Sequence, residues 1–323
     1  MSRDSIEKNQ VWIYIICVIV AMASGLVLPH VFERLSLVVT PLIAILMYAM
    51  FLQIPFLALK ETFSDKRFLF ALMTANFIFI PVIVGLLTLA IDDNTAIFIG
   101  ALLVLLTPCI DYVVVFTHIG KGNSRLVLSA TPLLLILQLM LLPLYLKIIA
   151  AGQITITISV EPFIEAFVFL ILIPLCLAVI TLYFSRKSKA VSAWNAMWGW
   201  LPVPAMAAVL VAVIGSQINT VVREITWLLP VVPVYLCFAV LAPLAGAFAA
   251  RLFRLPTASA RAVAFSASTR NSLVVLPLAL ALPENIRVLA AAAVITQTLI
   301  ELVSEIIYTR AIPRFIRQQE PAA

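Results

Sequence analysis

The stretch AVAFSASTRNSLVVLPLALAL, residues 262–282, has the length and hydropathy of a membrane span, yet it carries an arginine near its middle. About 20 predominantly apolar residues are enough to cross the hydrocarbon core of a bilayer. A guanidinium at that depth costs at least about 2.5 to 3.5 kcal/mol by insertion scales, so the protein must compensate the charge or use it. Arg270 therefore marks a candidate functional site.

A candidate counter-ion lies in a second apolar stretch, residues 96–119, at the matching place in the other half of the chain. This carboxylate is Asp111. Ionisable side chains inside a membrane usually pair with one another or lie on substrate and ion pathways. The pair predicts a transport site, and the alternative is a structural ion pair that locks two helices together. Both interpretations stay open at this point.

The composition sets the class of protein. Hydrophobic residues make up 64% of the chain and charged residues 11%, which excludes a soluble globule and predicts a polytopic membrane protein. The four cysteines show no CxxC spacing, so we expect neither a disulfide framework nor a metal site, and no cofactor. There is no HExxH motif and no nucleotide-binding loop, so we do not expect an enzyme.

The apolar stretches long enough to cross the membrane number ten, joined by short connections. We expect an all-α bundle that forms one transmembrane domain over residues 1–323. The predicted spans are 11–29, 36–59, 68–91, 96–119, 127–150, 161–184, 195–216, 227–250, 262–282 and 286–309.

The basic residues predict the orientation of these spans. Of the 21 lysines and arginines, sixteen fall on one side of the predicted membrane, four on the other, and Arg270 within it. Because cytoplasmic loops are rich in lysine and arginine, both termini should be cytoplasmic in a multi-pass protein of the cell (inner or plasma) membrane. The positive charge then reflects topology and contact with anionic lipid, and we expect no nucleic-acid partner.

Ten spans divide into two halves of five, about 1–152 and 153–323, and an odd number per half gives the halves opposite orientations. Such inverted repeats bind solute where helices from both halves are interrupted. The fourth span of each half, spans 4 and 9 of the chain, is the expected discontinuous crossing helix. Pro108 is the predicted break in the first and Pro277, after a polar run, in the second.

Two sets of residues are candidates for function. The expected substrate-binding residues offer a thiol, charges, an amide and hydroxyls inside these two spans: Cys109, Asp111, Ser268, Arg270, Asn271 and Ser272. The expected proton path combines a carboxyl within span 4, a histidine at its cytoplasmic end, and two carboxyls one turn apart in span 10 beside Gln297: Asp111, His118, Glu301 and Glu305. For Cys109 the alternative is packing, and for the two glutamates an interior pair satisfied by its neighbours.

The stretch LTPCIDYVVVFTHIGKGNSRLVLSATPLL, residues 106–134, resembles span 4 and the following turn of the bile acid:sodium symporter superfamily. The polar run Ser268 to Ser272 occupies the place of that superfamily's second crossing helix. Cys109 is similar to the span-4 cysteine of the arsenite-efflux permeases, the arsenic resistance branch, which carry trivalent arsenic and antimony. The resemblance covers the whole chain in topology and these two segments in motif.

The chain also departs from that pattern. In the sodium-coupled symporters, span 4 supplies a Ser-Asn pair and span 9 a Glu and a Gln that hold two sodium ions. These positions fall on Val113, Val114, Ser266 and Arg270 here. Because valine offers no oxygen ligand and a guanidinium repels a cation, the resemblance implies that sodium coupling is lost. A glutamate of the arsenite permeases falls on Ser272.

The sequence therefore predicts a secondary transporter that exports arsenite or antimonite, by antiport or otherwise, driven by the proton motive force or the membrane potential. A soft thiol such as Cys109 suits a thiophilic metalloid. The alternative is an organic-anion transporter in which Arg270 binds a small carboxylate. Under either interpretation the expected partners are a small solute, metalloid or organic anion, and the lipid bilayer.

Overall fold

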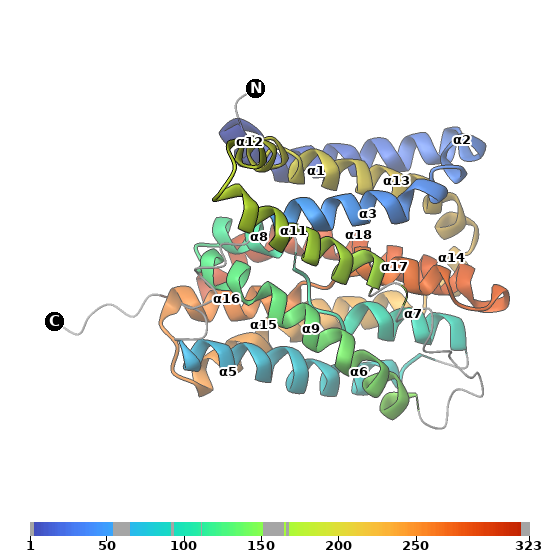
Figure 1. The fold of residues 1–323 in the computed structure, drawn as a ribbon. Coiled ribbons are helices and arrows are strands. Elements are labelled where there is room, and N and C mark those ends of the chain that lie inside the picture. The colour runs from blue at the N-terminus through green and yellow to red at the C-terminus, as the bar shows by residue number, and fades with distance from the viewer. Residues whose placement is uncertain are drawn as a thin grey trace. The chain divides into compact units, whose positions relative to one another are not determined.

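The structure is a computed structural model that describes residues 3–53, 65–91, 94–110, 112–150, 165 and 168–317. Within those ranges every regular element is a helix (Figure 1), which confirms the predicted all-α class. The elements are α1 (Arg3–Val27), α2 (Pro29–Glu33), α3 (Ser36–Phe51), α5 (Lys66–Thr74), the π-helix η1 (Ala75–Phe79), α6 (Ile80–Thr88), α7 (Thr95–Leu105), α8 (Val113–Ile119), α9 (Ser124–Ile149), the π-helix η2 (Val168–Leu172), α11 (Ile173–Ser185), α12 (Lys189–Trp198), α13 (Pro202–Arg223), α14 (Ile225–Leu228), α15 (Val231–Leu252), α16 (Thr257–Ser268), α17 (Ser272–Leu280) and α18 (Glu284–Phe315).

Several of these helices can span a membrane. Five are long and apolar enough: Lys66–Thr88, Val168–Ser185, Pro202–Arg223, Val231–Leu252 and Glu284–Phe315. A sixth candidate is α9, whose segments Ser124–Gln138 and Met140–Ile149 meet at an angle of 51°. Three other predicted spans contain shorter apolar helices, Trp12–Val27, Ser36–Phe51 and Thr95–Leu105. The chain is thus a multi-pass membrane protein, and the count of ten spans stays a prediction.

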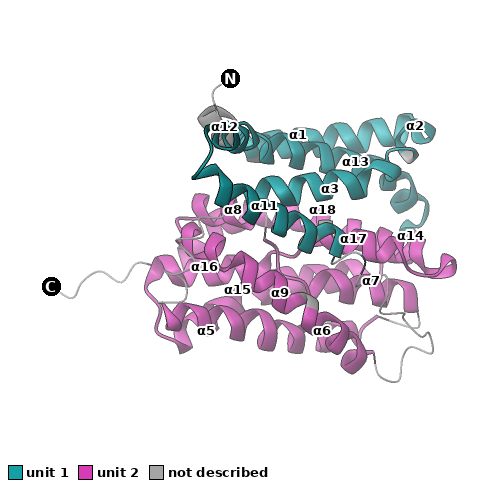
Figure 2. Ribbon diagram, in the orientation of Figure 1, with its two compact units in different colours: residues 1–54, 159–225 teal, residues 55–158, 226–323 magenta. Residues whose placement is uncertain are grey.

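The chain divides into two compact units (Figure 2). Unit 1 comprises residues 1–54 and 159–225, and unit 2 comprises residues 55–158 and 226–323. Each unit therefore contains one segment from each of the two predicted repeats. Within unit 1, α1 packs closely on α13. The two helices approach so closely that a side chain on Gly25 would meet the backbone of Gly215. The inverted orientation of the repeats stays a prediction.

Polar caps fix where several helices of unit 2 begin. The side-chain oxygens of Asp65, Asn94, Asn123 and Asn271 each accept a hydrogen bond from the backbone N–H three residues later, at 3.0 to 3.2 Å. These bonds satisfy donors that the first turn of a helix leaves without a partner. The caps start α5, α7, α9 and α17, so the start of span 4 and the resumption of span 9 after its break are encoded locally.

Two prolines in unit 2 each leave one backbone carbonyl without its helical hydrogen bond, and in each case a tyrosine of another helix binds that carbonyl. Pro81 has no N–H to bond the carbonyl four residues earlier, and the Tyr145 hydroxyl donates to that Phe77 carbonyl at 2.7 Å. In the same way Pro243 leaves the carbonyl of Ala239, and Tyr308 donates to it. Neighbouring helices thus restore the backbone bonds that prolines remove inside a membrane.

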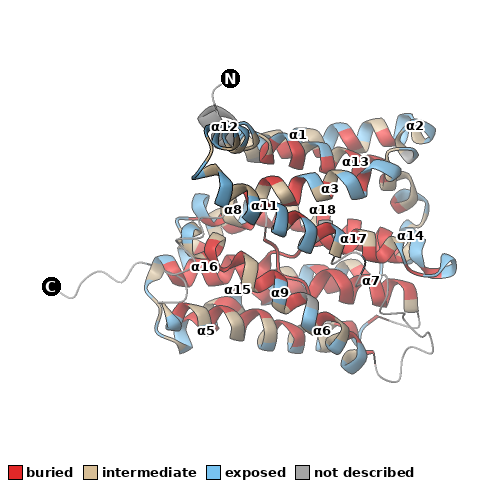
Figure 3. Ribbon diagram, viewed as in Figure 1, coloured by how far each residue is buried: buried red, intermediate tan, exposed pale blue. Residues whose placement is uncertain are grey.

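Small residues let α7 approach α18. A side-chain carbon on Gly100 would lie only 2.5 Å from the carbonyl oxygen of Ala290 and 3.0 Å from Ala293. Close backbone contact of this kind is typical of helices packed in membranes. Every residue of α7 from Ala96 to Leu105 is buried (Figure 3). The first segment of the interrupted span 4 therefore packs tightly against α18.

Candidate functional site

Two helices of unit 2 are interrupted where the predicted crossing helices lie. In span 4, α7 ends at Leu105 and α8 begins at Val113 (Figure 1). In span 9, α16 ends at Ser268 and α17 begins at Ser272. Pro108 lies in the first break, as predicted. Asp111 also falls between α7 and α8, and it lies outside the described residues.

The second break is not where it was predicted. Pro277 lies inside α17, and the break precedes that helix, at residues 269–271. Pro277 removes one bond, the one that its missing N–H would make to the carbonyl of Leu273, and the short helix α17 continues past it. The prediction of a helix break at Pro277 was therefore wrong, although a break in that span was right.

The two breaks pair with each other through their backbones. Pro108 and Arg270 form an isolated antiparallel bridge. The N–H of Cys109 donates to the carbonyl of Thr269 at 3.0 Å, and the N–H of Asn271 donates to the carbonyl of Thr107 at 2.8 Å. We call residues 107–109 and 269–271 the crossing. Because unsatisfied backbone groups are costly inside a membrane, this pairing allows both helices to unwind there.

Arg270 is fully buried at the crossing, and oxygen atoms of neutral groups surround its guanidinium. One terminal nitrogen, Nη2, donates to Asn76 Oδ1 at 2.9 Å and to the carbonyls of Ser266 and Ala267 at 2.7 and 2.6 Å. The other, Nη1, donates to the carbonyl of Leu105 at 3.4 Å. These contacts compensate a buried charge that would otherwise be very costly.

An aromatic ring completes the surroundings of Arg270. The guanidinium carbon lies 5.7 Å from the ring centroid of Phe238 on α15, within the range of a cation–π interaction. In the described ranges its Nε has no hydrogen-bond partner. Hydrogen bonds and the aromatic ring thus hold Arg270 on several sides, and its Nε is left without a partner among the described residues.

The carboxylate of Glu301 on α18 hydrogen-bonds to the backbone of the second break. Both of its oxygens accept the backbone N–H of Arg270, at 3.0 Å each. The Tyr112 hydroxyl donates to it at 2.7 Å, and Gln297 Nε2 donates from one turn earlier. Hydrogen bonds to an ionised acceptor are about twice as strong as neutral ones. Glu301 therefore holds α18, the crossing and the residue before α8 together.

Glu305, one turn further along α18, is fully buried but less completely bonded. One oxygen accepts from the Thr269 hydroxyl at 2.6 Å. The other has no partner within the part of the chain that the structure describes. Its electrostatic neighbours include Glu301 and Arg270. This carboxyl group therefore has an oxygen available to a proton or a solute.

The remaining predicted residues differ in their surroundings. Cys109 is buried in the crossing and Ser272 begins α17, so both lie beside Arg270. Asn271 uses its side-chain oxygen to cap α17. The Ser268 hydroxyl donates to carbonyls of its own helix, Ala264 and Phe265. His118 is exposed in the last turn of α8, so the structure does not bring it to the crossing.

Two residues of the site were not predicted. The sequence assigned neither Tyr112 nor Asn76 a place in the site. Asn76 Nδ2 donates to Ser266 Oγ at 3.1 Å while its oxygen binds Arg270, so this amide links the π-helix η1 to α16. A polar amide inside an apolar span is the signal that could have found it, since such residues usually face the interior of the bundle.

The interior of unit 2 has more hydrogen-bonding groups than its described residues satisfy. Buried side-chain atoms with no partner among the described residues include Thr117 Oγ1, both amide atoms of Gln138, Asn271 Nδ2, Ser272 Oγ and Gln297 Oε1. The large majority of buried side-chain polar atoms in proteins have a hydrogen-bond partner, either protein or water. Unit 2 therefore offers both donors and acceptors to a polar solute.

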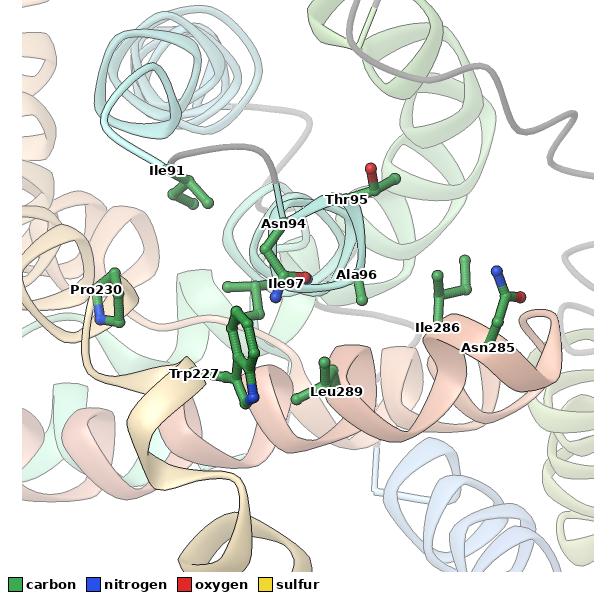
Figure 4. Close-up of a pocket in the computed structure, with 10 residues that line it drawn as sticks. All are labelled: Ile91, Asn94, Thr95, Ala96, Ile97, Trp227, Pro230, Asn285, Ile286 and Leu289. Atoms are coloured by element: carbon green, nitrogen blue, oxygen red, sulfur yellow. The ribbon is translucent and has the colours of Figure 1, made fainter.

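A separate pocket of about 540 Å³ lies at the beginnings of α7, α15 and α18 (Figure 4). Trp227, Asn94 and Asn285 are among its lining residues, most of which are apolar. None of the described residues of the crossing lines it. The predicted topology puts this pocket on the outer side of the membrane.

Comparison with known proteins gives a family. The model of the family described as "Sodium Bile acid symporter family" matches residues 40–224, more than half of the chain. No curated protein matches the chain. The matched stretch includes the first break and α9, and it ends before α16.

Proposed function

The chain belongs to the sodium bile acid symporter family, and from this premise we propose that it works without sodium and exports arsenite or antimonite. Members of the family are membrane transporters of organic anions or similar solutes, and they are not enzymes. The family membership is established, and the coupling ion and the solute are what we propose for this chain.

One observation carries the proposal of sodium independence. Asn76 Oδ1 and the carbonyls of Ser266 and Ala267 converge on one nitrogen of Arg270, at 2.6 to 2.9 Å. Amide and carbonyl oxygens are the ligands that hard cations such as sodium take in proteins. The guanidinium of Arg270 already fills this group of oxygens with a covalently attached positive charge. A sodium ion there would lose its ligands and meet a like charge.

The thiol of Cys109 supports the metalloid as solute. It is buried in the crossing, next to the bridge between Pro108 and Arg270. Sulfur ligands select soft, thiophilic centres such as trivalent arsenic and antimony over hard ions. Arsenite at neutral pH is mainly an uncharged trihydroxide, and its hydroxyls match the unpartnered donors and acceptors in the interior of unit 2, those of Asn271 and Ser272 beside the crossing among them.

Export of such a solute needs an energy source other than sodium. We propose the proton motive force or the membrane potential, with antiport of protons through the carboxyl groups of Asp111, Glu301 and Glu305 and with His118 at the cytoplasmic end of α8. The buried, incompletely bonded carboxyl of Glu305 supports this path. Both termini would be cytoplasmic in the cell membrane.

The second candidate function is transport of a small organic anion, in which Arg270 binds the carboxylate. The family description favours it. A bidentate grip on a carboxylate needs two parallel N–H donors on one edge of the guanidinium. Three acceptors already share Nη2, so this grip would require Arg270 to leave Asn76, Ser266 and Ala267.

The solute is tested in metalloid-sensitive cells. We expect wild type to lower arsenite and antimonite accumulation, and Cys109→Ser, Asp111→Asn and Arg270→Gln to lose this effect. Arg287→Gln is the matched control, because Arg287 is exposed and pairs with Glu284 at 3.0 Å away from the crossing. If wild type leaves accumulation unchanged, metalloid efflux is wrong, and uptake of a panel of small carboxylates becomes the next measurement.

The coupling ion is tested in proteoliposomes. Transport by wild type should be unaffected when sodium is replaced by choline on both sides. A requirement for a sodium gradient would contradict the proposal that the guanidinium of Arg270 occupies the place of a sodium ion. This result is independent of the solute, so either part of the proposal can fail alone.

A further inference from the structure

Gln138 is a buried residue on α9 whose side-chain amide lacks partners among the described residues. Its exposed fraction is 1%, and neither its amide nitrogen nor its amide oxygen has a hydrogen-bond partner in the described part of the chain. A buried amide without partners is destabilising, so such a residue calls for a ligand.

The position of Gln138 corresponds to that of Glu301 in the other half of the chain. The carbonyl–tyrosine contacts described above recur at nearly the same spacing, since Pro243 follows Pro81 by 162 residues and Tyr308 follows Tyr145 by 163. Gln138 stands seven residues before Tyr145 on α9, and Glu301 stands seven residues before Tyr308 on α18.

The crossing explains why the two counterparts differ. Glu301 binds the backbone N–H of Arg270, and Arg270 follows its bridge partner Pro108 by the same spacing of 162 residues. The group that corresponds to this N–H in the first half is the nitrogen of Pro108, which carries no hydrogen. Gln138 therefore lacks the donor that its counterpart binds.

The bend in α9 lies directly beside Gln138. The helix changes direction by 51° between Gln138 and Met140, and Pro143 removes the bond to the carbonyl of Leu139. A broken helix whose backbone lines a cavity is the usual form of a solute site in transporters built from repeats. Two independent features, the unpartnered amide and the bend, thus coincide at one turn of α9.

We propose that Gln138 is the solute contact of the first half, where its amide hydrogen-bonds an uncharged hydroxyl group of the solute. A hydroxyl both donates and accepts, as the unpartnered amide does, whereas an ion would gain no charge compensation from it. The inference rests on the proposed export of arsenite for the identity of the solute. Cys109, which follows Pro108 directly, would bind the arsenic atom while Gln138 binds a hydroxyl.

The first test compares transport with stability. Gln138→Met keeps the length of the side chain and removes both polar atoms. We expect the KM for arsenite in proteoliposomes to rise about tenfold, the loss of one hydrogen bond, with kcat nearly unchanged. The unfolding temperature should not fall, because no protein partner is lost. Thr131→Val on the same helix is the control, because that hydroxyl bonds only its own helix in the described structure, at Val127.

The second test does not depend on the solute. In a protein freed of its four cysteines, Gln138→Cys should react with a charged methanethiosulfonate reagent, and Met140→Cys, whose native side chain is 72% exposed on the predicted lipid face, should not. An unreactive Gln138→Cys would overturn the proposal, as would an unchanged KM in Gln138→Met. If Gln138→Cys reacts while wild type carries no metalloid, only the proposed solute fails.

Discussion

Glu301 and Glu305 stand one helical turn apart on α18, but they meet different surroundings. Glu301 accepts hydrogen bonds from the backbone of Arg270, from Tyr112 and from Gln297. Glu305 accepts one from Thr269, and its second oxygen is unpartnered among the described groups. A carboxylate with several donors is fixed in place, whereas one with a bare oxygen can exchange a proton. Within the proposed proton path we therefore expect Glu301 mainly to hold the crossing in place and Glu305 to bind and release the proton.

Replacing each glutamate by glutamine separates these roles. Glu301→Gln puts an NH₂ group where donors converge, and we expect the free energy of unfolding in detergent to fall by about 1 to 3 kcal/mol. Glu305→Gln keeps the acceptor for Thr269, so its stability should stay within about 1 kcal/mol of wild type. Its transport in proteoliposomes should no longer respond to a pH gradient. A wild-type pH response in Glu305→Gln would rule out this carboxyl as the proton carrier.

The sequence predicted some of these residues and missed others for a physical reason. Two carboxyls one turn apart in an apolar span had to face the interior, and the structure confirms that both are buried. Tyr112 and Asn76 were not recognised as partners of Glu301 and Arg270, because those bonds join residues 189 and 194 positions apart. Local spacing carries no information about contacts of that range.

At the scale of the helices, the two breaks follow from different causes. The first contains Pro108, which cannot donate to the preceding turn, and its position was predicted correctly. The second contains no proline, and it is held by the backbone bridge and by Glu301 at Arg270. A rule that looks for proline therefore selected Pro277, which α17 accommodates.

The contact between α7 and α18 should tolerate no added volume. Gly100→Ala puts a methyl group against the backbone of Ala290, so the helices must separate or unfold. We expect a loss of about 1 to 3 kcal/mol, measured by thermal unfolding in detergent. Gly85→Ala in α6 is the matched control, because a side chain there meets nothing within 4 Å. The control should be as stable as wild type or slightly more so. Equal losses in both variants would mean that close packing at Gly100 is not the cause.

For the molecule as a whole, the asymmetry of basic residues predicts which loops face the cytoplasm. In a cysteine-free protein, Asn285→Cys should react with a membrane-impermeant maleimide added to intact cells. Lys187→Cys should react only after permeabilisation, and both native side chains are exposed. One exposed position in each predicted loop should alternate in the same way if ten spans exist. Two successive loops on the same side would reduce the count.

The bridge at the crossing also constrains the biogenesis of the protein. The hydrogen bond from Asn271 to the carbonyl of Thr107 joins residues that the ribosome synthesises at well-separated times. At translation rates of about 5 to 20 residues per second, the second strand of the bridge follows the first after on the order of 10 s. Until then, the first half enters the bilayer with an open backbone break, which is costly in lipid. Nascent chains that stop before residue 269 should therefore be degraded by the proteases of membrane quality control.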